Sequence, residues 1–546
     1  MFCYQCEQTS KGTGCTAMGV CGKTPLASDL QDVLFHLTKG LSRWTHKARQ
    51  HGIKDEATDL LTIEALFATV TNVDFDPERL GDMITRVSRA RDDMRQRYQD
   101  ACAQQGATPE ELDGPASFVP APDLAQLQAQ AIGLAIAKRQ LERGETLTGL
   151  EELIAYGLKG MAAYTDHAAI LGRRSDAVMA FFHECLDFLC TEHGVEELLS
   201  MALRVGQVNL DVMGMLDEAH TTTFGHPSPT QVRVTARAGK AILVSGHDLA
   251  DLKALLEQTA GSGIQIYTHG EMLPAHGYPE LNKHDHLAGN YGGAWQDQAR
   301  EFDDFPGAIL MTTNCIQKPK DSYSERLFTC GLVAWPGVRH IRGHDFAPVI
   351  EAALAAPGFT EEGPEEHITV GFGHKAVLSQ AEAVVRAVKE GKLRHFFLIG
   401  GCDGAKSGRN YYTELAQAVP DDCLIMTLAC GKYRFNKLDF GEVAGLPRLL
   451  DIGQCNDAYS AIQIAAALAE AFETDVNGLP LSLVLSWYEQ KAVVILLSLL
   501  HLGIKQIRLG PSLPAFLTPA ALDVLIEAYQ IAPISSVQED LAQMLA

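Results

Sequence analysis

The sequence predicts a multidomain protein of the α and α/β class, in which an N-terminal all-α helical-bundle domain precedes two Rossmann-like parallel α/β domains. At 546 residues the chain is too long for one compact core. Apolar residues recur with helical spacing from Asp29 to about His220, and beyond His226 short β-rich runs alternate with helical patterns. We expect domains over residues 1–225 (including a cysteine-rich N-terminal loop), 226–365 and 366–546.

The first domain carries both helical periodicity and a helix-start signal. Its first apolar positions follow i, i+3, i+4, i+7 spacing at Leu30, Val33, Leu34, Leu37 and Leu41. Asp76-Pro77 predicts a second start, with Asp as the N-cap and Pro in the first turn. A Pro-rich connector at 115–122 divides the helices into two groups.

Eight β-rich runs are expected to form two parallel sheets, because strand–helix alternation implies crossover connections. The runs are Ala241–Ser245, Ile264–Thr268, Ala308–Thr313, Leu332–Trp335, Phe396–Ile399, Leu424–Leu428, Leu449–Ile452 and Leu483–Leu485.

Composition excludes several classes of function. The chain has 45 Lys and Arg against 68 Asp and Glu, a net charge of −23, which argues against general binding of nucleic acid or anionic lipid. It contains no apolar run of about 18 residues, as a membrane span would need. The segment Met1–Cys6 does not resemble a signal peptide. Thirteen cysteines then favour metal binding or reactive thiols over disulfides, and we expect a cytoplasmic protein.

Four cysteines near the N-terminus have the density of a metal site. Cys3, Cys6, Cys15 and Cys21 form a C-x2-C-x8-C-x5-C pattern, with glycines between them that let the backbone wrap closely. The spacing matches neither a ferredoxin nor a zinc finger. On spacing alone, an iron–sulfur cluster and a structural zinc are equally good interpretations.

A second set of metal-binding residue types follows the predicted strands. Ligands of parallel α/β domains bind beyond the carboxyl ends of the strands. Seven β-runs lead directly to such a residue: His247, Glu271, Cys315, Cys402, Cys430, Cys455 and Glu489. Each one alone has an ordinary structural explanation, but their repetition at one position of the fold indicates a shared site.

The donor types of this set suit a polynuclear iron centre. Four thiols, one imidazole and two carboxylates are too many for one tetrahedral zinc. Thiolates favour iron–sulfur chemistry, whereas carboxylates favour harder, oxygen-bridged ions. A centre with a sulfur-rich and an oxygen-rich end can keep one iron open to substrate.

These residues lie in motifs that resemble the hybrid cluster protein family (prismane proteins, also described as hydroxylamine reductases). The motifs are CYQC at 3–6, VSGH ending at 247, THGEMLPAH around Glu271, TTNC ending at 315, GGCDGAKSGRNYY around Cys402, LACGKYRF around Cys430, GQCNDAYSA around Cys455 and WYEQKA around Glu489. The resemblance covers essentially the whole chain and departs at no ligand position. In architecture it extends to nickel–iron carbon monoxide dehydrogenases.

The resemblance implies two cofactors. The compact N-terminal spacing is similar to the anaerobe-type class, so Cys3, Cys6, Cys15 and Cys21 would bind a [4Fe–4S] cluster. The seven strand-end residues would bind a hybrid [4Fe–2O–2S] cluster. Of these seven, Cys402, which follows Gly400 and Gly401, would be the persulfide position.

The resemblance also implies the reduction of hydroxylamine to ammonia and water. The alternatives are nitric oxide reduction or detoxification, or protein S-nitrosylation and nitric oxide sensing through the same cluster. Electrons from an unidentified redox partner would enter at the N-terminal cluster, with His247, Glu271, Cys402 and Glu489 at the reacting centre. Lys491 is either a source of positive charge there or a solvated surface residue.

Other titratable residues have ordinary interpretations. Cys185 and Cys190 lie in an apolar helical pattern and are expected in the core. The pairs Asp166/His167 and His183/Glu184 are expected on helix surfaces.

Overall fold

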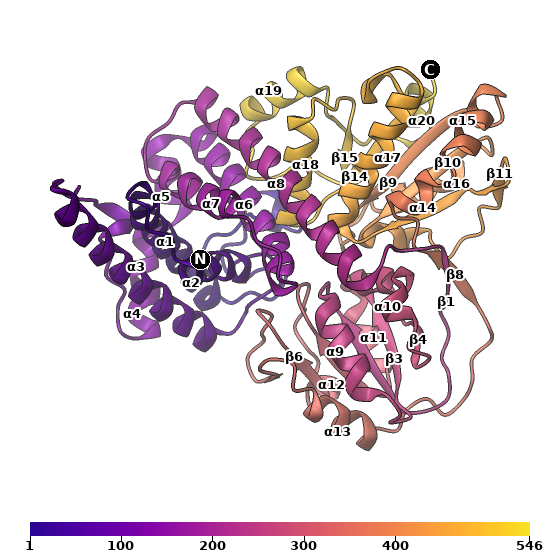
Figure 1. Cartoon of the computed structure of the whole chain (residues 1–546), viewed down its shortest axis with the longest axis horizontal. Coiled ribbons are helices and arrows are strands. Elements are labelled where there is room, and N and C mark those ends of the chain that lie inside the picture. Colours follow the sequence, from indigo (N-terminus) through magenta and orange to yellow (C-terminus); the bar gives the residue numbers. More distant parts are fainter.

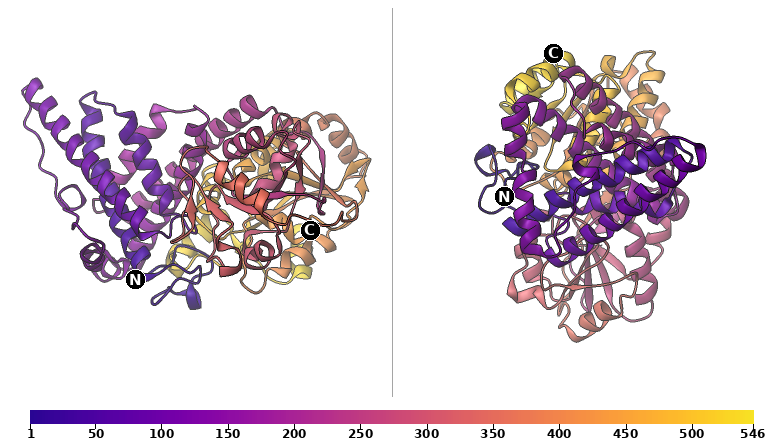
Figure 2. Two further views of the ribbon diagram at one scale, coloured as in Figure 1. Left: turned by 90° about the horizontal axis from the view of Figure 1, so that it is seen from below. Right: turned by 90° about the vertical axis from the view of Figure 1, so that its left-hand side faces the viewer.

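The computed structural model describes the whole chain, Met1–Ala546, and confirms the predicted fold class. A helical region occupies one end of the molecule, and two α/β units lie beside each other at the other end (Figures 1 and 2). The limits of the three domains remain a prediction. No helix combines the length and the apolar character that crossing a bilayer requires.

The helical region contains eight α-helices after the cysteine-rich loop. Asp76 accepts a hydrogen bond from the backbone N–H of Glu78 at 2.9 Å and caps the third helix, as predicted. The helices are α1 (Pro25–Gln50), α2 (Glu56–Ala68), α3 (Pro77–Gln105), α4 (Leu124–Ala131), α5 (Ile136–Arg143), α6 (Glu145–Ile170), α7 (Asp176–Phe188) and α8 (Val195–Phe224).

The first α/β unit contains a six-stranded, all-parallel sheet in the order β4-β3-β2-β5-β6-β7. Its strands are β2 (Ala241–Ser245), β3 (Gln265–His269), β4 (Leu287–Asn290), β5 (Ala308–Met311), β6 (Leu327–Thr329) and β7 (Arg339–His340). Its helices are α9 (Leu249–Thr259), α10 (Pro279–Asn282), α11 (Gln298–Asp304), α12 (Asp321–Ser324) and α13 (Ala347–Ala355).

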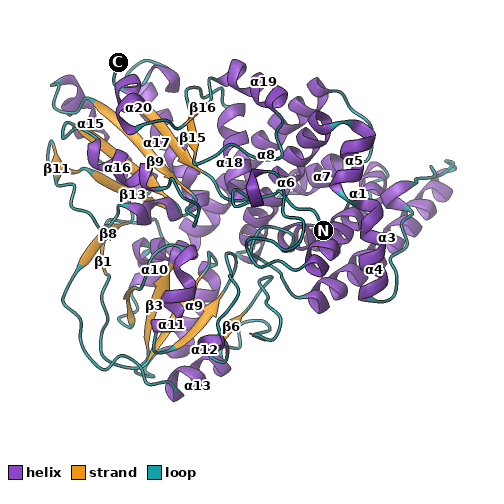
Figure 3. Ribbon diagram, turned by 180° about the vertical axis from the view of Figure 1, so that it is seen from behind, coloured by secondary structure: helices purple, strands orange, loops and turns teal.

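The second unit contains another six-stranded parallel sheet, in the order β13-β10-β9-β14-β15-β16, again between helices (Figure 3). Its strands are β9 (His395–Gly401), β10 (Cys423–Leu428), β13 (Leu449–Gly453), β14 (Leu481–Ser486), β15 (Arg508–Gly510) and β16 (Ala532–Pro533). Its helices are α14 (His374–Leu378), α15 (Ala381–Lys389), α16 (Asn410–Ala418), α17 (Ala458–Ala471), α18 (Gln490–His501), α19 (Pro519–Tyr529) and α20 (Val537–Met544). The short pairs β1 (Thr230–Arg233) with β8 (His367–Val370), and β11 (Glu442–Val443) with β12 (Leu446–Pro447), are antiparallel.

Both sheets have the same strand order. Counted along the chain within each sheet, the order is 3-2-1-4-5-6, the arrangement of the doubly wound dinucleotide-binding fold. The order reverses between β2 and β5 in one sheet and between β9 and β14 in the other. A crevice for ligands is expected outside the carboxyl ends of these strands.

Seven of the eight predicted runs overlap strands, and the prediction for Leu332–Trp335 is wrong. That segment is a turn with one isolated bridge, Asp74 to Ala334, and the strand of this region is β6. Its residues are apolar for another reason: Leu332 packs against the core of the helical region, and Val333 lies in the core of the first α/β unit.

Glycines on α6 and α8 bring the second α/β unit close to the helical region. A Cβ atom at Gly160 would collide with the backbone of Gln490, and one at Gly206 with that of Leu497. Helix α18 therefore approaches both helices at backbone distance. Because α18 begins directly after Glu489, this packing fixes one of the predicted site residues.

Candidate metal centre

All seven strand-end residues line one cavity of about 430 Å³. From the first sheet, His247 follows β2, Glu271 follows β3 and Cys315 lies beyond β5. From the second sheet, the cavity receives Cys402 after β9, Cys430 after β10, Cys455 after β13 and Glu489 after β14. The carboxyl ends of the strands of both sheets therefore meet at one cavity. This is the place where the sequence predicts a shared site.

At four of the strand ends, the residue before the predicted ligand has a positive φ. Gly246, Gly270 and Gly401 directly precede His247, Glu271 and Cys402, and each has positive φ, at 122°, 57° and 105°. Ala429 precedes Cys430 with a φ of 61°, a conformation that L-residues rarely adopt. At Gly401 a side chain would also collide with the backbone oxygen of Ser486.

The imidazole of His247 is held on one side by Thr313. The Thr313 hydroxyl lies 2.9 Å from Nδ1 and accepts a hydrogen bond from the His247 backbone N–H at 2.8 Å. Nε2 is left on the cavity side, 3.6 Å from a carboxylate oxygen of Glu271. Burial, followed by the nearby Lys491 charge, lowers the pKa of His247 well below its ordinary value, so the ring is neutral, the form that binds metals.

Gln454 joins the two halves of the site. Its amide donates to the backbone oxygens of His247 at 3.1 Å and Glu271 at 2.7 Å. The next residue, Cys455, donates its backbone N–H to the Glu271 carboxylate at 2.9 Å. Possible ligand atoms of His247, Glu271 and Cys455 all lie within 4.8 Å of one another.

Lys491 belongs to the site and is not a solvated surface residue. It is 1% exposed, and its ammonium lies 3.0 Å from Nε2 of His247, 2.9 Å from the amide oxygen of Asn314 and 3.7 Å from Glu489. Burial disfavours its charge, but the surrounding Cys455 and Glu489 outweigh burial and raise the Lys491 pKa. A fixed cation therefore balances part of the negative charge of the donor set.

Of the four cysteines of the site, Cys430 and Cys455 are buried, and Cys315 and Cys402 are half-buried. Burial, and then the neighbouring carboxylates, raises the pKa of Cys430 well above its ordinary value and that of Cys402 to about 12. Thiolates in such a place need a cation to balance them, and a bound metal supplies it. The buried hydroxyl of Tyr164, from α6, has no hydrogen-bond partner in the chain and lies beside Cys455.

The N-terminal cysteines form a compact loop next to this cavity. Cys3 and Cys15 exchange backbone hydrogen bonds of 3.1 and 2.8 Å, and the Ser10 N–H lies 3.4 Å from the Cys15 sulfur. Burial, followed by the charges of Cys3, Cys21 and Cys15, raises the pKa of Cys6. Each of the other three thiols is therefore near enough to Cys6 to affect its pKa.

Two aromatic rings lie between the cysteine loop and the cavity. Trp295 and Tyr488 contact each other with ring centroids 4.3 Å apart, in one apolar group with Cys6 and Cys430. Both rings also line the cavity. The two candidate centres are therefore separated by packed protein and not by water.

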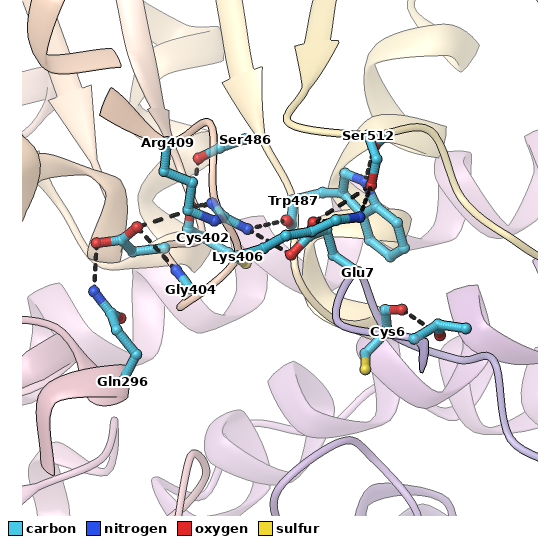
Figure 4. A network of polar contacts seen from close by, with 12 residues as sticks. Cys6, Glu7, Gln296, Cys402, Gly404, Lys406, Arg409, Ser486, Trp487 and Ser512 are labelled. Atoms are coloured by element: carbon cyan, nitrogen blue, oxygen red, sulfur yellow. Dashed lines mark hydrogen bonds and ion pairs between the residues drawn. The ribbon is translucent and has the colours of Figure 1, made fainter. Parts of the chain in front are cut away.

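A buried ion pair ties the cysteine loop to the Cys402 loop (Figure 4). The Glu7 carboxylate lies 3.1 Å from the Arg409 guanidinium and 3.2 Å from the Lys406 ammonium. Arg409 in turn donates to the backbone oxygens of Cys402 at 3.1 Å and Trp487 at 3.0 Å. Glu7 and Arg409 therefore link the loop of the N-terminal cysteines to the loop of Cys402.

An apolar cavity borders the site next to Cys402 and Cys455. Cys402 and Cys455 stand at one end, and the rest of the lining comes mainly from apolar residues of β14, α17 and α18. This region admits small uncharged molecules more readily than ions.

Three interpretations of ordinary residues need correction. Cys185 is buried in the core as expected, but Cys190 is half-buried and borders a polar cavity, because it lies beyond the end of α7. His167 and His183 are buried, not on helix surfaces, because each meets a buried carboxylate: His167 lies 3.9 Å from Asp248, and His183 lies 2.9 Å from Asp59.

Sequence reasoning did not identify several residues that support the site. Thr313, Gln454 and Tyr488 stand next to or near predicted site residues, and their adjacency was the available signal. Arg409 lies within the motif around Cys402, whereas Tyr164 carries no local signal, since only the fold brings it near Cys455.

Known proteins are similar to this chain over its whole length. The model of the Prismane/CO dehydrogenase family matches residues 1–542. A protein of Rhodospirillum rubrum described as hydroxylamine reductase is 56% identical over 545 residues, covering 100% of this chain and 99% of the relative. One of Geobacter sulfurreducens with the same description is also 56% identical, with the same coverage.

Solved structures agree at the level of fold. Carbon monoxide dehydrogenase IV of Carboxydothermus hydrogenoformans has a TM-score of 0.55 at 15% identity, with 99% of this chain and 92% of that chain covered. The nickel-free carbon monoxide dehydrogenase of Thermococcus sp. AM4 gives 0.54 at 16%, covering 100% and 89%. With the full-length family match, these likenesses lead to one conclusion: this chain belongs to the Prismane/CO dehydrogenase family, whose prismane members are iron–sulfur proteins.

Proposed function

We propose that this protein is a hydroxylamine reductase, which reduces hydroxylamine to ammonia and water with two electrons and two protons. The observation that carries the proposal is the single cavity lined by four thiols, one imidazole and two carboxylates. The full-length identity to proteins described as hydroxylamine reductases supports the same activity.

Two sets of residues would hold the cofactors. His247, Glu271, Cys315, Cys402, Cys430, Cys455 and Glu489 would bind a hybrid [4Fe–2O–2S] cluster, with Cys402 as a persulfide. Cys3, Cys6, Cys15 and Cys21 would bind a [4Fe–4S] cluster of the anaerobe-type class. The donor set fits, because seven donors around one cavity exceed the four that a tetrahedral zinc takes, and mixed sulfur and oxygen donors suit a polynuclear iron centre. When bound, the hybrid cluster would supply electrons and Lewis acidity at an open iron.

The protein's own groups would orient the substrate and supply protons. Glu271 and Glu489 are buried, and burial raises the pKa of both, so these carboxyl groups would take up a proton more readily than a carboxyl group in water. The Lys491 ammonium would stabilise negative charge that develops on the oxygen of the breaking N–O bond. Trp295 and Tyr488 close one side of the cavity and exclude water from it.

The electron donor would be a redox partner protein, in keeping with a reaction that consumes two electrons per turnover. Electrons would enter at the cysteine loop, where Cys3 and Cys21 are half-buried and thus nearer the solvent than Cys6 and Cys15. The short packed path through Trp295 and Tyr488 would then lead to the hybrid centre.

Nitric oxide is the second candidate substrate or ligand. The apolar cavity beside Cys402 and Cys455 favours it, because a small uncharged diatomic partitions into such a space. Nitric oxide reduction, or transfer of a nitrosyl group to a protein thiol, would use the same centre.

Anaerobic turnover with a reduced dye tests the proposal. Stoichiometric ammonia from hydroxylamine supports the reductase, and Cys430→Ser is expected to abolish activity and the hybrid-cluster EPR signal together. Activity retained without that signal would refute the assignment. Nitrosylation of the cluster followed by transfer to a thiol, with no ammonia formed, would favour the second candidate.

A further inference from the structure

A polar cavity lies in the helical region, on the other side of the cysteine loop from the hybrid site. It has about 1030 Å³ of space and is lined by residues of α1, α5 and α6 and by Cys3. Exposed Gly133 and half-buried Leu134 stand at its rim, so it communicates with solvent. The function proposed above makes no use of this cavity.

The cavity contains an excess of positive charge, although the whole chain carries −23. Four cationic side chains line it, against the two carboxylates of Asp32 and Glu152. The four cations are Lys23, Lys39, Arg139 and Lys159. Two of them have partners: Arg139 pairs with Glu152, and Lys23 donates to the amide oxygen of Gln31 at 2.5 Å.

The other two cations, Lys39 and Lys159, have no hydrogen-bond or ion-pair partner in the protein. Both ammonium groups lie over the ring of Phe35, at 5.3 Å and 4.8 Å from its centroid. An aromatic ring offsets only a small part of the cost of taking an ammonium group out of water. Burial lowers the pKa of Lys39, and it lowers that of Lys159 to about 8 although the charges of Glu152 and Asp32 act against the effect of burial on Lys159.

We propose that this cavity binds a small inorganic oxyanion between Lys39 and Lys159, next to the N-terminal cysteine cluster. An oxyanion offers several acceptor oxygens to the two ammonium groups and neutralises the charge that the chain leaves unpaired. Phe35 supplies an apolar part of the lining, and Cys3 belongs to the same lining.

Binding there is linked to the redox state of the cluster, and this part rests on the cluster proposed for Cys3, Cys6, Cys15 and Cys21. Reduction adds a negative charge beside the bound anion, so the oxidised form binds the anion more tightly. By thermodynamic linkage the anion then lowers the reduction potential of that cluster. A tenfold difference in affinity corresponds to 59 mV for one electron.

Calorimetric titration of the anaerobically purified holoprotein with phosphate and with nitrite tests the site, with chloride as the ionic-strength control. We expect one oxyanion per chain, at least tenfold weaker binding in Lys39→Met and Lys159→Met, and unchanged binding in Lys54→Met. Lys54 is a matched control, because it lies in the same region with its side chain 62% exposed. If Lys159→Met fails to fold by circular dichroism, the half-buried Lys39 decides the question alone.

Binding in Lys39→Met equal to wild type, or no saturable binding of either oxyanion, would overturn the proposed site. An EPR-monitored redox titration of the N-terminal cluster tests the linkage. When the protein is saturated with the oxyanion, the reduction potential of the cluster should become more negative in wild type and Lys54→Met but not in Lys39→Met. A potential unmoved by a bound anion would overturn the linkage while leaving the site intact. Absence of an N-terminal cluster would refute the cofactor assignment, but the calorimetric comparison would still decide whether the anion site exists.

Discussion

Replacement of Glu7 by Gln tests whether one buried ion pair holds the two candidate centres together. The side chains of Glu7 and Arg409 are 0% and 1% exposed, and their charged groups lie 3.1 Å apart. Removing one partner of a buried pair costs about 3–5 kcal/mol, because the other charge stays buried. Asp403, 3.9 Å from Arg409, compensates part of that charge, so we expect the lower end, about 3 kcal/mol.

Hydrogen exchange of the 402–410 segment measures this cost locally, which suits a multidomain chain whose unfolding is not a single two-state step. A loss of about 3 kcal/mol corresponds to roughly 100-fold faster exchange, at 1.4 kcal/mol for each factor of ten. Glu110→Gln is the control. Glu110 lies 2.9 Å from Lys47, but its side chain is 56% exposed, so the pair contributes little. This substitution should change the hydrogen exchange of the 402–410 segment by less than about fivefold. Equal effects of the two substitutions would contradict the reasoning.

Three further predictions concern the site and its surroundings. Gly401→Ala should lower hybrid-cluster content and activity together, because the φ of 105° and a backbone oxygen of β14 leave no room for a side chain. Gly391 also has a positive φ, of 68°, but open space surrounds it, so Gly391→Ala should leave both properties intact. Lys491→Met should lower kcat about 10–100-fold with iron content retained, and unchanged kcat at full iron occupancy would exclude a role for its charge. Burial raises the Asp74 pKa to about 7, above its ordinary value of 3.8. The folded state thus binds the Asp74 proton more tightly than the unfolded state does. The contribution of Asp74 to the stability of the folded protein therefore falls as the pH rises from about 4 to 7. Asp74→Asn should therefore gain stability relative to wild type across this range in thermal unfolding, and a difference independent of pH would contradict the prediction.

Much of the fold could be predicted because its signals are local. Helical periodicity after Asp29, the Asp76 cap and the β-rich runs each depend on neighbouring residues, and the parallel sheets follow from their alternation. The exception, Leu332–Trp335, shows the limit of such signals. An apolar run identifies buried residues, but it does not say whether they pair in a sheet or pack against another domain.

The candidate site could be predicted to the level of its strand-end residues, since the carboxyl ends of parallel strands meet at one edge. Its supporting residues could not be found in the same way. Tyr164 comes from a helix distant in sequence, and the Glu7–Arg409 pair joins residues 402 positions apart. The two buried histidines, His167 and His183, were placed on surfaces because the buried carboxylates near them are distant in sequence.

Anomalous diffraction at the iron edge from anaerobically grown crystals decides whether the protein holds two iron centres. We expect two separate groups of iron peaks, one among Cys3, Cys6, Cys15 and Cys21 and one within the cavity lined by the seven strand-end residues. A single zinc in that cavity, or iron at the N-terminal cysteines alone, would contradict this expectation.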